Sequence, residues 1–281
     1  MTGPADAAAA EDLATGAGEL LLATRREHAG DPRIGERGDR AANTWLMAQL
    51  RSRFPNDAVL CEEEPDDPRR RLGAARVWIV DPLDGTREFA EPGRWDWAVH
   101  VALWCAPAGG ALGATDRATQ RAPGAGGVTG AGGVTGAGGV TAAAVAMPAR
   151  QITFSTATRC SLPERPSDRV LIVVSRSRPP SVAASVAAAT GGDIVALGSA
   201  GAKAMAVVRG EADVYLHAGG QYEWDSAAPV GVAMAAGLHA SRLDGSPLTY
   251  NQPDPYVPDL LICRLELAAP VLAAVAAARA G

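Results

Sequence analysis

The chain has 281 residues, of which 47% are hydrophobic and 20% charged, and its formal net charge is −5 at pH 7. This length and composition are typical of a globular protein with a large core, built as one big domain or two coupled ones. The acidic balance excludes a protein that binds a nucleic-acid backbone over a broad basic face, but a few local cations could still hold a small phosphorylated ligand.

Targeting and redox signals favour a cytoplasmic protein. The N-terminus, MTGPADAAAAEDL, carries acids early and has no basic region before an apolar one, so we expect no signal peptide. No apolar run approaches the roughly 20 residues needed to span a bilayer, so we expect no stable membrane association. The cysteines lack metal-ligand spacing, and so few in a chain of this length suggest reduced thiols rather than disulfides. They are Cys61, Cys105, Cys160 and Cys263.

Periodicity in the first half predicts two helices followed by a sheet. A helix is expected over residues 8–28, and a second from about Asp39, which stands where an N-cap would be. Strands are expected in DAVLC at 57–61, ARVWIVDP at 75–82 and DWAVHVALWC at 96–105. The continuous apolar run of the second is typical of a strand covered on both faces. Pro82 has no N–H for the ladder, so we expect this strand to end there.

A perfect repeat interrupts the first half, with GAGGVT at 124–129, 130–135 and 136–141. Because this segment has little side-chain area to offset its ordering entropy, we interpret residues 116–141 as a flexible loop inserted between two strands. The alternative is a turn of β-solenoid, although so few copies rarely stack. The sheet is expected to resume in VTAAAVAMPA at 140–149.

Strands and helices alternate through the second half. Strands are expected at 169–179 and 259–266, helices at 180–190, 223–245 and 269–281, and a strand, glycine turn, helix and strand over 192–220. This alternation favours an α/β arrangement. We therefore expect an N-terminal α+β half, 1–150, that carries the metal-binding motifs, and a C-terminal α/β half, 151–281, that completes the active site.

The segment DPLDGT combines metal ligands with a phosphate-binding turn. Asp81 and Asp84 lie three residues apart, so both carboxylates and the carbonyl of Leu83 can face one point. Hard oxygen ligands of this kind suit Mg²⁺ or Mn²⁺ rather than zinc. Gly85 and Thr86 follow where a turn or helix would open, and backbone N–H groups at such an opening can bind a phosphate. The alternative is an Asp-Pro turn followed by a glycine turn.

Further acids could complete this site. Glu62 is nearest the end of its strand and can reach a neighbouring strand end such as that of Asp81. Asp225 lies at the start of the helix in EWDSAAP, where its alternative role is an N-cap. The other acids near Glu62 are interpreted as solvated loop charges: Glu63, Glu64, Asp66 and Asp67.

Three segments together resemble the inositol monophosphatase superfamily: CEE at 61–63, DPLDGT at 81–86 and WDSAAP at 224–229. The triplet Arg87-Glu88-Phe89 resembles the bisphosphate nucleotidase branch, because inositol phosphatases more often carry Asn before that Phe. GSAGAKAMAVVRGEADVYLH and LDGSPLTYN resemble the same branch. The likeness spans roughly residues 10–275 and is greatest to the actinobacterial CysQ type of 3′(2′),5′-bisphosphate nucleotidase.

The resemblance implies a fold and an activity. The fold would be an α/β layered α-β-α-β-α sandwich, often dimeric. The activity would be a Mg²⁺-dependent, lithium-sensitive phosphomonoesterase that converts adenosine 3′,5′-bisphosphate to AMP, with its sulfated precursor as a further substrate (PAPS to APS), in sulfur assimilation. An inositol monophosphatase or fructose-1,6-bisphosphatase with the same metal site is the alternative enzyme. A catalytically silent nucleotide-binding or scaffold protein is the non-enzyme alternative.

The resemblance also implies roles for single residues. Glu62, Asp81 and the Leu83 carbonyl would hold one Mg²⁺, and Asp81, Asp84 and Asp225 a second. Asp39 would help to hold a third, although Glu36-Arg37-Gly38 precedes it where the family has a Thr-Lys-x-Asp pattern. Glu62 and Thr86 would position the nucleophilic water. The implied substrate-binding residues are Glu62, Leu83, Asp84, Gly85, Thr86, Ser199, Lys203 and Asp225.

Lys203 is the only lysine among 26 basic residues, and it lies in the glycine turn GSAGAK at a helix start. A lysine is a compact point charge, whereas arginine is a longer planar fork, so the two are not interchangeable at a tight phosphate site. We expect Lys203, helped by Ser199, to contact the second phosphate or the nucleotide. The alternative is chance survival on a helix surface. Arg176, Arg178 and His217 could line the same pocket or be polar surface.

Overall fold

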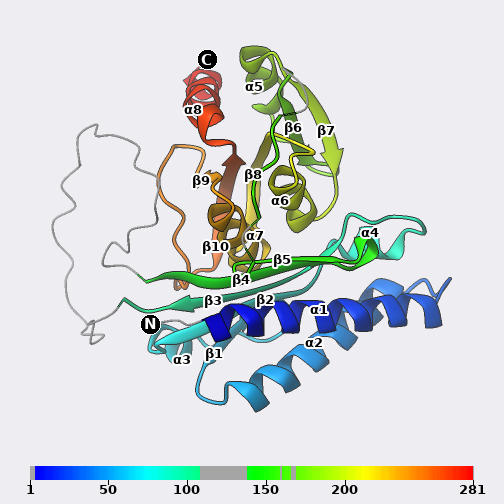
Figure 1. Ribbon diagram of the computed structural model, residues 1–281. Coiled ribbons are helices and arrows are strands. Elements are labelled where there is room, and N and C mark those ends of the chain that lie inside the picture. Colours follow the sequence, from blue (N-terminus) through cyan, green and yellow to red (C-terminus); the bar gives the residue numbers. More distant parts are fainter. Residues whose placement is uncertain (1–3, 108–137, 159, 166–168, 281) are drawn as a thin grey trace.

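The computed structural model describes residues 4–107, 138–158, 160–165 and 169–280 (Figure 1). Most of the GAGGVT repeat, and with it the predicted flexible loop, lies outside these residues. The chain forms two five-stranded sheets with the strand orders β1-β2-β3-β4-β5 and β7-β6-β8-β10-β9. Among the described residues, no helix combines the length and hydrophobicity required to cross a membrane.

The first sheet follows two long helices, α1 (Pro4–Glu27) and α2 (Ile34–Arg53). Its strands are β1 (Ala58–Cys61), β2 (Arg76–Asp84), β3 (Ala98–Cys105), β4 (Gly139–Met147) and β5 (Ile152–Ser155). The short helices α3 (Pro68–Leu72) and α4 (Thr86–Ala90) follow β1 and β2, and the 3₁₀ helix η1 (Pro148–Arg150) follows β4. β1 and β2 are parallel, and the other neighbouring pairs are antiparallel.

The second sheet mostly alternates with helices, as the sequence predicts, but the helix expected at 223–245 ends at Ala235, and His239–Ser241 form a strand. Its strands are β6 (Leu171–Ser175), β7 (Asp193–Leu197), β8 (Val214–Tyr222), β9 (His239–Ser241) and β10 (Tyr256–Cys263). Its helices are α5 (Ala183–Thr190), α6 (Ala200–Val208), α7 (Glu223–Ala235) and α8 (Leu265–Ala280). β6 is parallel to β7 and β8, whereas β10 is antiparallel to β8 and β9. The division at residue 150 stays a prediction, and β5 pairs with the first sheet although it lies beyond that point.

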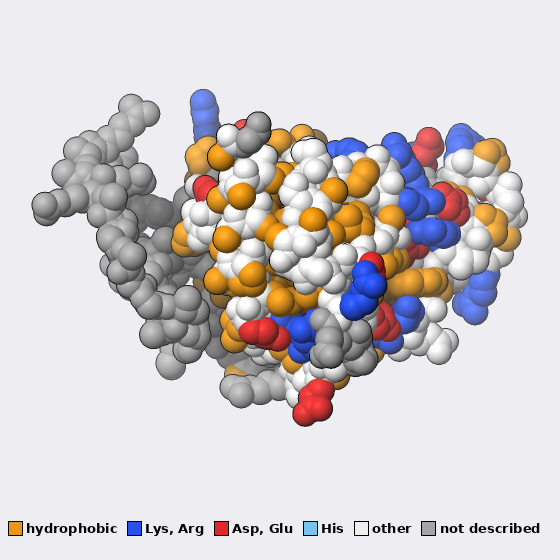
Figure 2. Space-filling model, turned by 90° about the horizontal axis from the view of Figure 1, so that it is seen from above, with side chains coloured by type: hydrophobic (Ala, Val, Ile, Leu, Met, Phe, Trp, Pro, Cys, Tyr) orange, Lys and Arg blue, Asp and Glu red, His pale blue; other side chains and the backbone are white. Residues whose placement is uncertain are grey.

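The structure has five layers: α1 with α2, the first sheet, α6 with α7, the second sheet, and α5 with α8 (Figure 1). Three hydrophobic cores lie between them. One core joins α1 and α2 to the first sheet, a second joins both sheets through α6 and α7, and a third joins the second sheet to α5 and α8. In Figure 2, hydrophobic side chains are scattered over the middle of the face seen from above, and charged side chains lie mainly toward its periphery. The predicted α-β-α-β-α sandwich is confirmed.

The alternation of side chains along each strand explains how the first sheet contributes to two hydrophobic cores. In β2, Val77 and Ile79 pack toward the core shared by the two sheets, whereas Trp78 and Val80 pack toward α1 and α2. Successive side chains of a strand point to opposite faces, so a strand buried on both sides is apolar at every position. The continuous run VWIV therefore reflects burial on both faces.

The prediction that this strand ends at Pro82 is wrong. β2 continues to Asp84, and its register with β3 shifts between Asp81, opposite His100, and Asp84, opposite Ala98. Three steps along β2 thus match two along β3, which is a β-bulge, and a proline is tolerated there because one residue is left out of the ladder. In a regular strand Asp81 and Asp84 would face opposite sides, whereas the extra residue lets both face α7.

Candidate active site

Three carboxylates meet where β2 ends against α7. One oxygen each from Asp81, Asp84 and Asp225 lies within 4.8 Å of the other two. Asp81 and Asp84 are buried, and Asp81 accepts a hydrogen bond from the backbone N–H of Leu83 at 3.0 Å, which fixes its direction inside the bulge. Asp225 is the third residue of α7 rather than its N-cap, and it accepts from the Tyr222 N–H at 2.6 Å. The Asp225 carboxylate therefore stabilises the N-terminus of α7 and also belongs to the acid cluster.

The cluster has an excess of negative charge. Burial, together with the charges of Glu62 and Asp84, raises the pKa of Asp81 well above its usual range. Burial and the Asp84 charge raise the pKa of Asp225 to about 6, and burial with the charges of Asp225 and Asp84 raises that of Glu62 to about 7. Buried carboxylates this close need a cation to remain ionised together. The donor set is all oxygen, so it fits a hard divalent cation such as Mg²⁺.

Cation affinity is expected to weaken by roughly tenfold or more between pH 8 and pH 6. In the cation-free protein, Glu62 takes up a proton as the pH falls through about 7, and Asp225 does so near 6. A ligand must be deprotonated to hold the cation, so a proton has to be displaced at the lower pH. Calorimetric titration with Mg²⁺ at the two pH values measures this, and equal dissociation constants would contradict it.

Asp84 is held in place by a set of donors. Its Oδ2 accepts from Ser199 Oγ at 2.5 Å and from the Gly201 N–H at 2.7 Å, and it lies 3.2 Å from His100 Nε2. Burial alone would raise the pKa of Asp84, but His100, Lys203 and the Ser199 hydroxyl hold it below its ordinary value. The carboxylate at the centre of the cluster is thus the one that stays ionised. His100 was not predicted, although a histidine within the apolar run AVHVALWC was a possible signal.

The turn after β2 requires a glycine. Gly85 has φ 91° and precedes α4, and a Cβ there would lie 3.2 Å from Ser199 Cβ and 3.3 Å from the Asp96 carbonyl oxygen. A left-handed conformation at this close approach suits only glycine. The next residue, Thr86, opens α4, so the predicted opening of a helix at Gly85-Thr86 is confirmed. Both residues line the cavity described below.

Asp39 is not an N-cap, because α2 begins five residues earlier, at Ile34. Arg33 is the N-cap, and Asp31 lies in the turn before it, where its carboxylate accepts from the Arg33 N–H at 2.8 Å. Asp39 instead lies inside α2 and accepts from Thr86 Oγ1 at 3.3 Å, and the same hydroxyl lies 3.3 Å from the Leu83 carbonyl oxygen. Burial and the charge of Glu63 raise the pKa of Asp39 to about 7. Asp39 is therefore connected to the candidate site through its hydrogen bond with Thr86.

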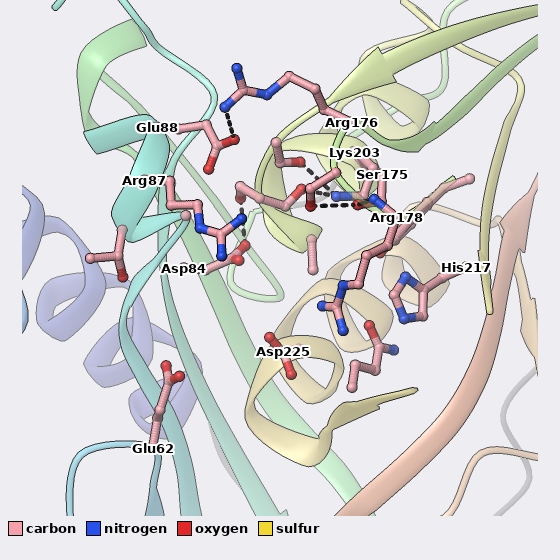
Figure 3. Close-up of a pocket in the computed structure, with 18 residues that line it drawn as sticks. Glu62, Asp84, Arg87, Glu88, Ser175, Arg176, Arg178, Lys203, His217 and Asp225 are labelled. Carbon is pink, nitrogen blue, oxygen red and sulfur yellow. Dashed lines mark hydrogen bonds and ion pairs between the residues drawn. The ribbon is translucent and has the colours of Figure 1, made fainter. Parts of the chain in front are cut away.

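A cavity of about 830 Å³ opens beside the acid cluster (Figure 3). Glu62 and Arg87 border it on one side, and Arg178 and His217 on the other. Asp84 and Asp225 lie between them. The side chains that line it include both acids and cations, so it can hold a metal ion and phosphate groups together. The lining does not include three of the predicted site residues, Asp39, Asp81 and Leu83. They would contribute to the site from behind the residues that line the cavity.

Lys203 is buried rather than on a helix surface, with 4% of its area exposed. Its Nζ donates to the carbonyl oxygens of Gly198 and Ser199, both at 2.6 Å, and burial lowers its pKa to about 8. Ser199 precedes α6, where its Oγ accepts from the Ala202 N–H at 2.9 Å and donates to Asp84. Lys203 thus fastens the turn that orients Asp84, while it also lines the cavity.

The three weaker candidates, Arg176, Arg178 and His217, all line the cavity. Arg176 is engaged by acids, since its Nη2 lies 2.7 Å from Glu88 Oε1 and 2.9 Å from Glu91 Oε1. Arg178 and His217 line the cavity, and His217 is buried, so it is not polar surface. Two further lining residues, Tyr215 and Gln221, were not predicted. Their only sequence signal was their place in the strand that precedes EWD.

The chain belongs to the inositol monophosphatase family, whose model matches residues 5–119 and 133–278. Proteins of this family are metal-dependent, and the cluster of Asp81, Asp84 and Asp225 could hold a metal ion. Among solved structures, Mycobacterium tuberculosis SuhB is similar in fold, with a TM-score of 0.67 at 21% identity over 99% of this chain and 98% of that one. An IMPase from Thermotoga maritima has a TM-score of 0.67 at 18% identity, covering 96% of each chain.

Sequence relatives are more specific than the fold. A Mycobacterium leprae protein named 3′-phosphoadenosine 5′-phosphate phosphatase is 51% identical over 272 residues, 95% of this chain and 92% of the relative. A Mycobacterium tuberculosis protein of the same name is 50% identical over 265 residues, 92% of this chain and 89% of the relative. The Escherichia coli 3′(2′),5′-bisphosphate nucleotidase CysQ is 29% identical, covering 76% of this chain and 78% of the relative. The predicted resemblance to CysQ-type phosphatases is confirmed.

Proposed function

We propose that this protein is a Mg²⁺-dependent phosphomonoesterase that removes the 3′-phosphate of adenosine 3′,5′-bisphosphate to give AMP, and that it also accepts the sulfated precursor, within sulfur assimilation. The observation that carries the proposal is the buried cluster of Asp81, Asp84 and Asp225 beside a cavity with cationic walls. The names of the relatives at about 50% identity support this substrate. The intact cluster argues against a silent scaffold protein.

The proposed metal ligands extend the cluster of Asp81, Asp84 and Asp225 to neighbouring oxygens. We assign one Mg²⁺ to Glu62, Asp81 and the Leu83 carbonyl, a second to Asp81, Asp84 and Asp225, and a third, more loosely held, to Asp39. When bound, Mg²⁺ polarises phosphoryl oxygens and lowers the pKa of water. Mn²⁺ is expected to substitute, and Li⁺ to inhibit. Ser199, Gly201 and His100 hold the Asp84 carboxylate so that its free oxygen stays directed at the cation.

The proton of the attacking water needs an acceptor. Glu62 and the Thr86 hydroxyl would orient the water. Because Thr86 Oγ1 donates to Asp39 Oδ1, the hydroxyl can take the water proton while passing its own to that carboxylate. When no third cation is bound to it, Asp39 has a pKa of about 7, which matches a base that works near neutral pH. The N–H groups of Gly85 and Thr86 would bind the phosphoryl oxygens at the turn.

Lys203 is proposed to bind the second phosphate through its ammonium charge. Its hydrogen bonds to the Gly198 and Ser199 carbonyl oxygens would also hold this turn in place. Lys203→Arg is expected to raise KM for adenosine 3′,5′-bisphosphate by about tenfold or more, because a guanidinium cannot occupy the same buried space and hydrogen bonds to charged groups are lost. Steady-state kinetics measure this. Arg209→Lys, on the partly exposed residue that follows α6, is the control and should leave KM unchanged. An unchanged KM in Lys203→Arg would contradict the role.

The metal requirement and the enzyme class are tested together. Phosphate release from adenosine 3′,5′-bisphosphate should occur with Mg²⁺ and stop with excess EDTA, then return when Mg²⁺ is restored. Release that persists in EDTA would contradict the metal assignment.

We also propose a homodimer in the cytoplasm. Light scattering tests the homodimer, since a measured mass near the 28.7 kDa of a single chain would contradict it.

A further inference from the structure

One end of the cavity carries buried polar atoms without a protein partner. Tyr215, His217 and Gln221 come from β8, are 0%, 5% and 6% exposed, and line the cavity. Within the described part of the chain, no hydrogen-bond partner is found for Tyr215 Oη, His217 Nδ1 or either amide atom of Gln221. Buried polar groups in folded proteins are nearly always paired, so unpaired atoms that line a cavity need a partner inside it, such as a ligand, an ion or water. These atoms are therefore placed for a ligand.

The strand is shaped to present them. Gly219 and Gly220 have φ values of 104° and 87°, and the register between β8 and β10 shifts at this point. A Cβ on Gly220 would lie 2.4 Å from Tyr256 Oη, so only glycine fits there. The irregularity brings the Gly220 carbonyl oxygen to 3.0 Å from His217 Nε2. The glycine pair thus fixes the ring of His217 and leads into Gln221.

The hydrogen bond of His217 defines what its other nitrogen can do. A carbonyl oxygen only accepts, so Nε2 carries the proton that it donates to Gly220. Burial, with the charges of Lys203 and Arg178, lowers the pKa of His217, so the ring is neutral and Nδ1 is a free acceptor. With Gln221, this end of the cavity offers two acceptors and an NH₂ donor.

We propose that Gln221 and His217 recognise the adenine base of the substrate. The Gln221 amide would accept from the N6 amino group and donate to N7, the pairing that glutamine makes with adenine, and His217 Nδ1 would accept the other amino hydrogen. In Figure 3 His217 lies across the cavity from Glu62, which leaves the nucleotide between the base-binding end and the metal-binding end. This inference rests on the proposed function, because it concerns the base of the same substrate.

Inosine 3′,5′-bisphosphate is the matched probe, since it carries a carbonyl oxygen where adenine carries the amino group. The wild-type protein should prefer the adenosine compound by about tenfold or more in kcat/KM. Gln221→Met should lower kcat/KM for the adenosine compound about tenfold and that for the inosine compound less, since only the bond to N7 is lost there, and so reduce the preference. Gln221→Glu keeps an acceptor for the amino group but loses the donor to N7, so it should lower turnover of both nucleotides and keep the preference for the adenosine compound. Gln49→Met in α2 is the control and should keep the preference.

Hydrolysis of p-nitrophenyl phosphate, which has no base, reports whether the metal site and fold are intact; it should be equal in wild type and Gln49→Met, and in Gln221→Met it should fall less than turnover of the adenosine compound. Turnover of both nucleotides with the preference unchanged in Gln221→Met would overturn this inference and leave the proposed function standing. Turnover of neither nucleotide by the wild-type protein would overturn the proposed function and this inference together.

Discussion

Asp225→Asn is expected to lower kcat/KM for phosphate release by about a thousandfold, because a cation supplies several kcal/mol of transition-state stabilisation and each 1.4 kcal/mol is a factor of ten. Asp225 is the acid that α7 adds to the two from β2. An asparagine oxygen can still accept from the Tyr222 N–H, so the helix end should survive the change. The effect should therefore fall on the cation rather than on folding.

The control for this prediction is Asp254→Asn. Asp254 accepts from the Tyr256 N–H at 3.1 Å in an exposed loop, so it makes a similar local bond away from the cluster. Its activity should match wild type. Thermal melting gives a second readout, since Mg²⁺ should raise the Tm of wild type and Asp254→Asn but barely that of Asp225→Asn. Wild-type activity in Asp225→Asn would show that the cluster is not the catalytic metal site.

Arg71→Met is expected to lower the free energy of unfolding by about 3 kcal/mol. Arg71 is 1% exposed and forms two bonds with Asp66, at 2.9 and 2.7 Å. It also donates to Asn251 Oδ1 at 2.8 Å and to the Gln252 carbonyl oxygen at 3.0 Å. Methionine fills much of the space but leaves the buried Asn251 oxygen without this donor and the partly buried Asp66 carboxylate without its cation, which costs more than the bonds themselves contributed.

Urea denaturation measures this change. Arg51→Met is the matched control, because Arg51 is 73% exposed and lies 3.6 Å from Glu64, and surface pairs of this kind contribute about 0–1 kcal/mol. A difference between the two variants of less than about 1 kcal/mol would contradict the structural role of Arg71. Since Asn251 and Gln252 also donate to Glu223 at the start of α7, the Arg71 variant should lose some activity as well.

The local sequence predicted the metal-binding segment but not how it is built. The spacing of Asp81 and Asp84 indicated two ligands facing one point, whereas the reason offered, an end of the strand at Pro82, was wrong. A β-bulge produces the same result within a continuing strand. Bulges depend on pairing with the neighbouring strand, which a single segment does not reveal.

Contacts between distant segments account for the residues that were missed. His100 reaches Asp84 because β3 pairs with β2, and Gln221 reaches the cavity because β8 belongs to the second sheet. Neither position has a local motif. Asp39 was misjudged as an N-cap because helix ends are weakly specified by sequence, and α2 begins earlier, at Ile34, without a side-chain cap that the sequence could reveal. The layered architecture itself was predictable from the resemblance and from the alternation of strands and helices.

The most direct test of the account is the rate of phosphate release from adenosine 3′,5′-bisphosphate with Mg²⁺, compared with inositol 1-phosphate and fructose 1,6-bisphosphate under the same conditions. The account predicts a strong preference for the nucleotide, with adenosine 5′-phosphate rather than adenosine 3′-phosphate as the product identified by chromatography. Equal or faster release from either sugar phosphate, or formation of adenosine 3′-phosphate, would contradict it.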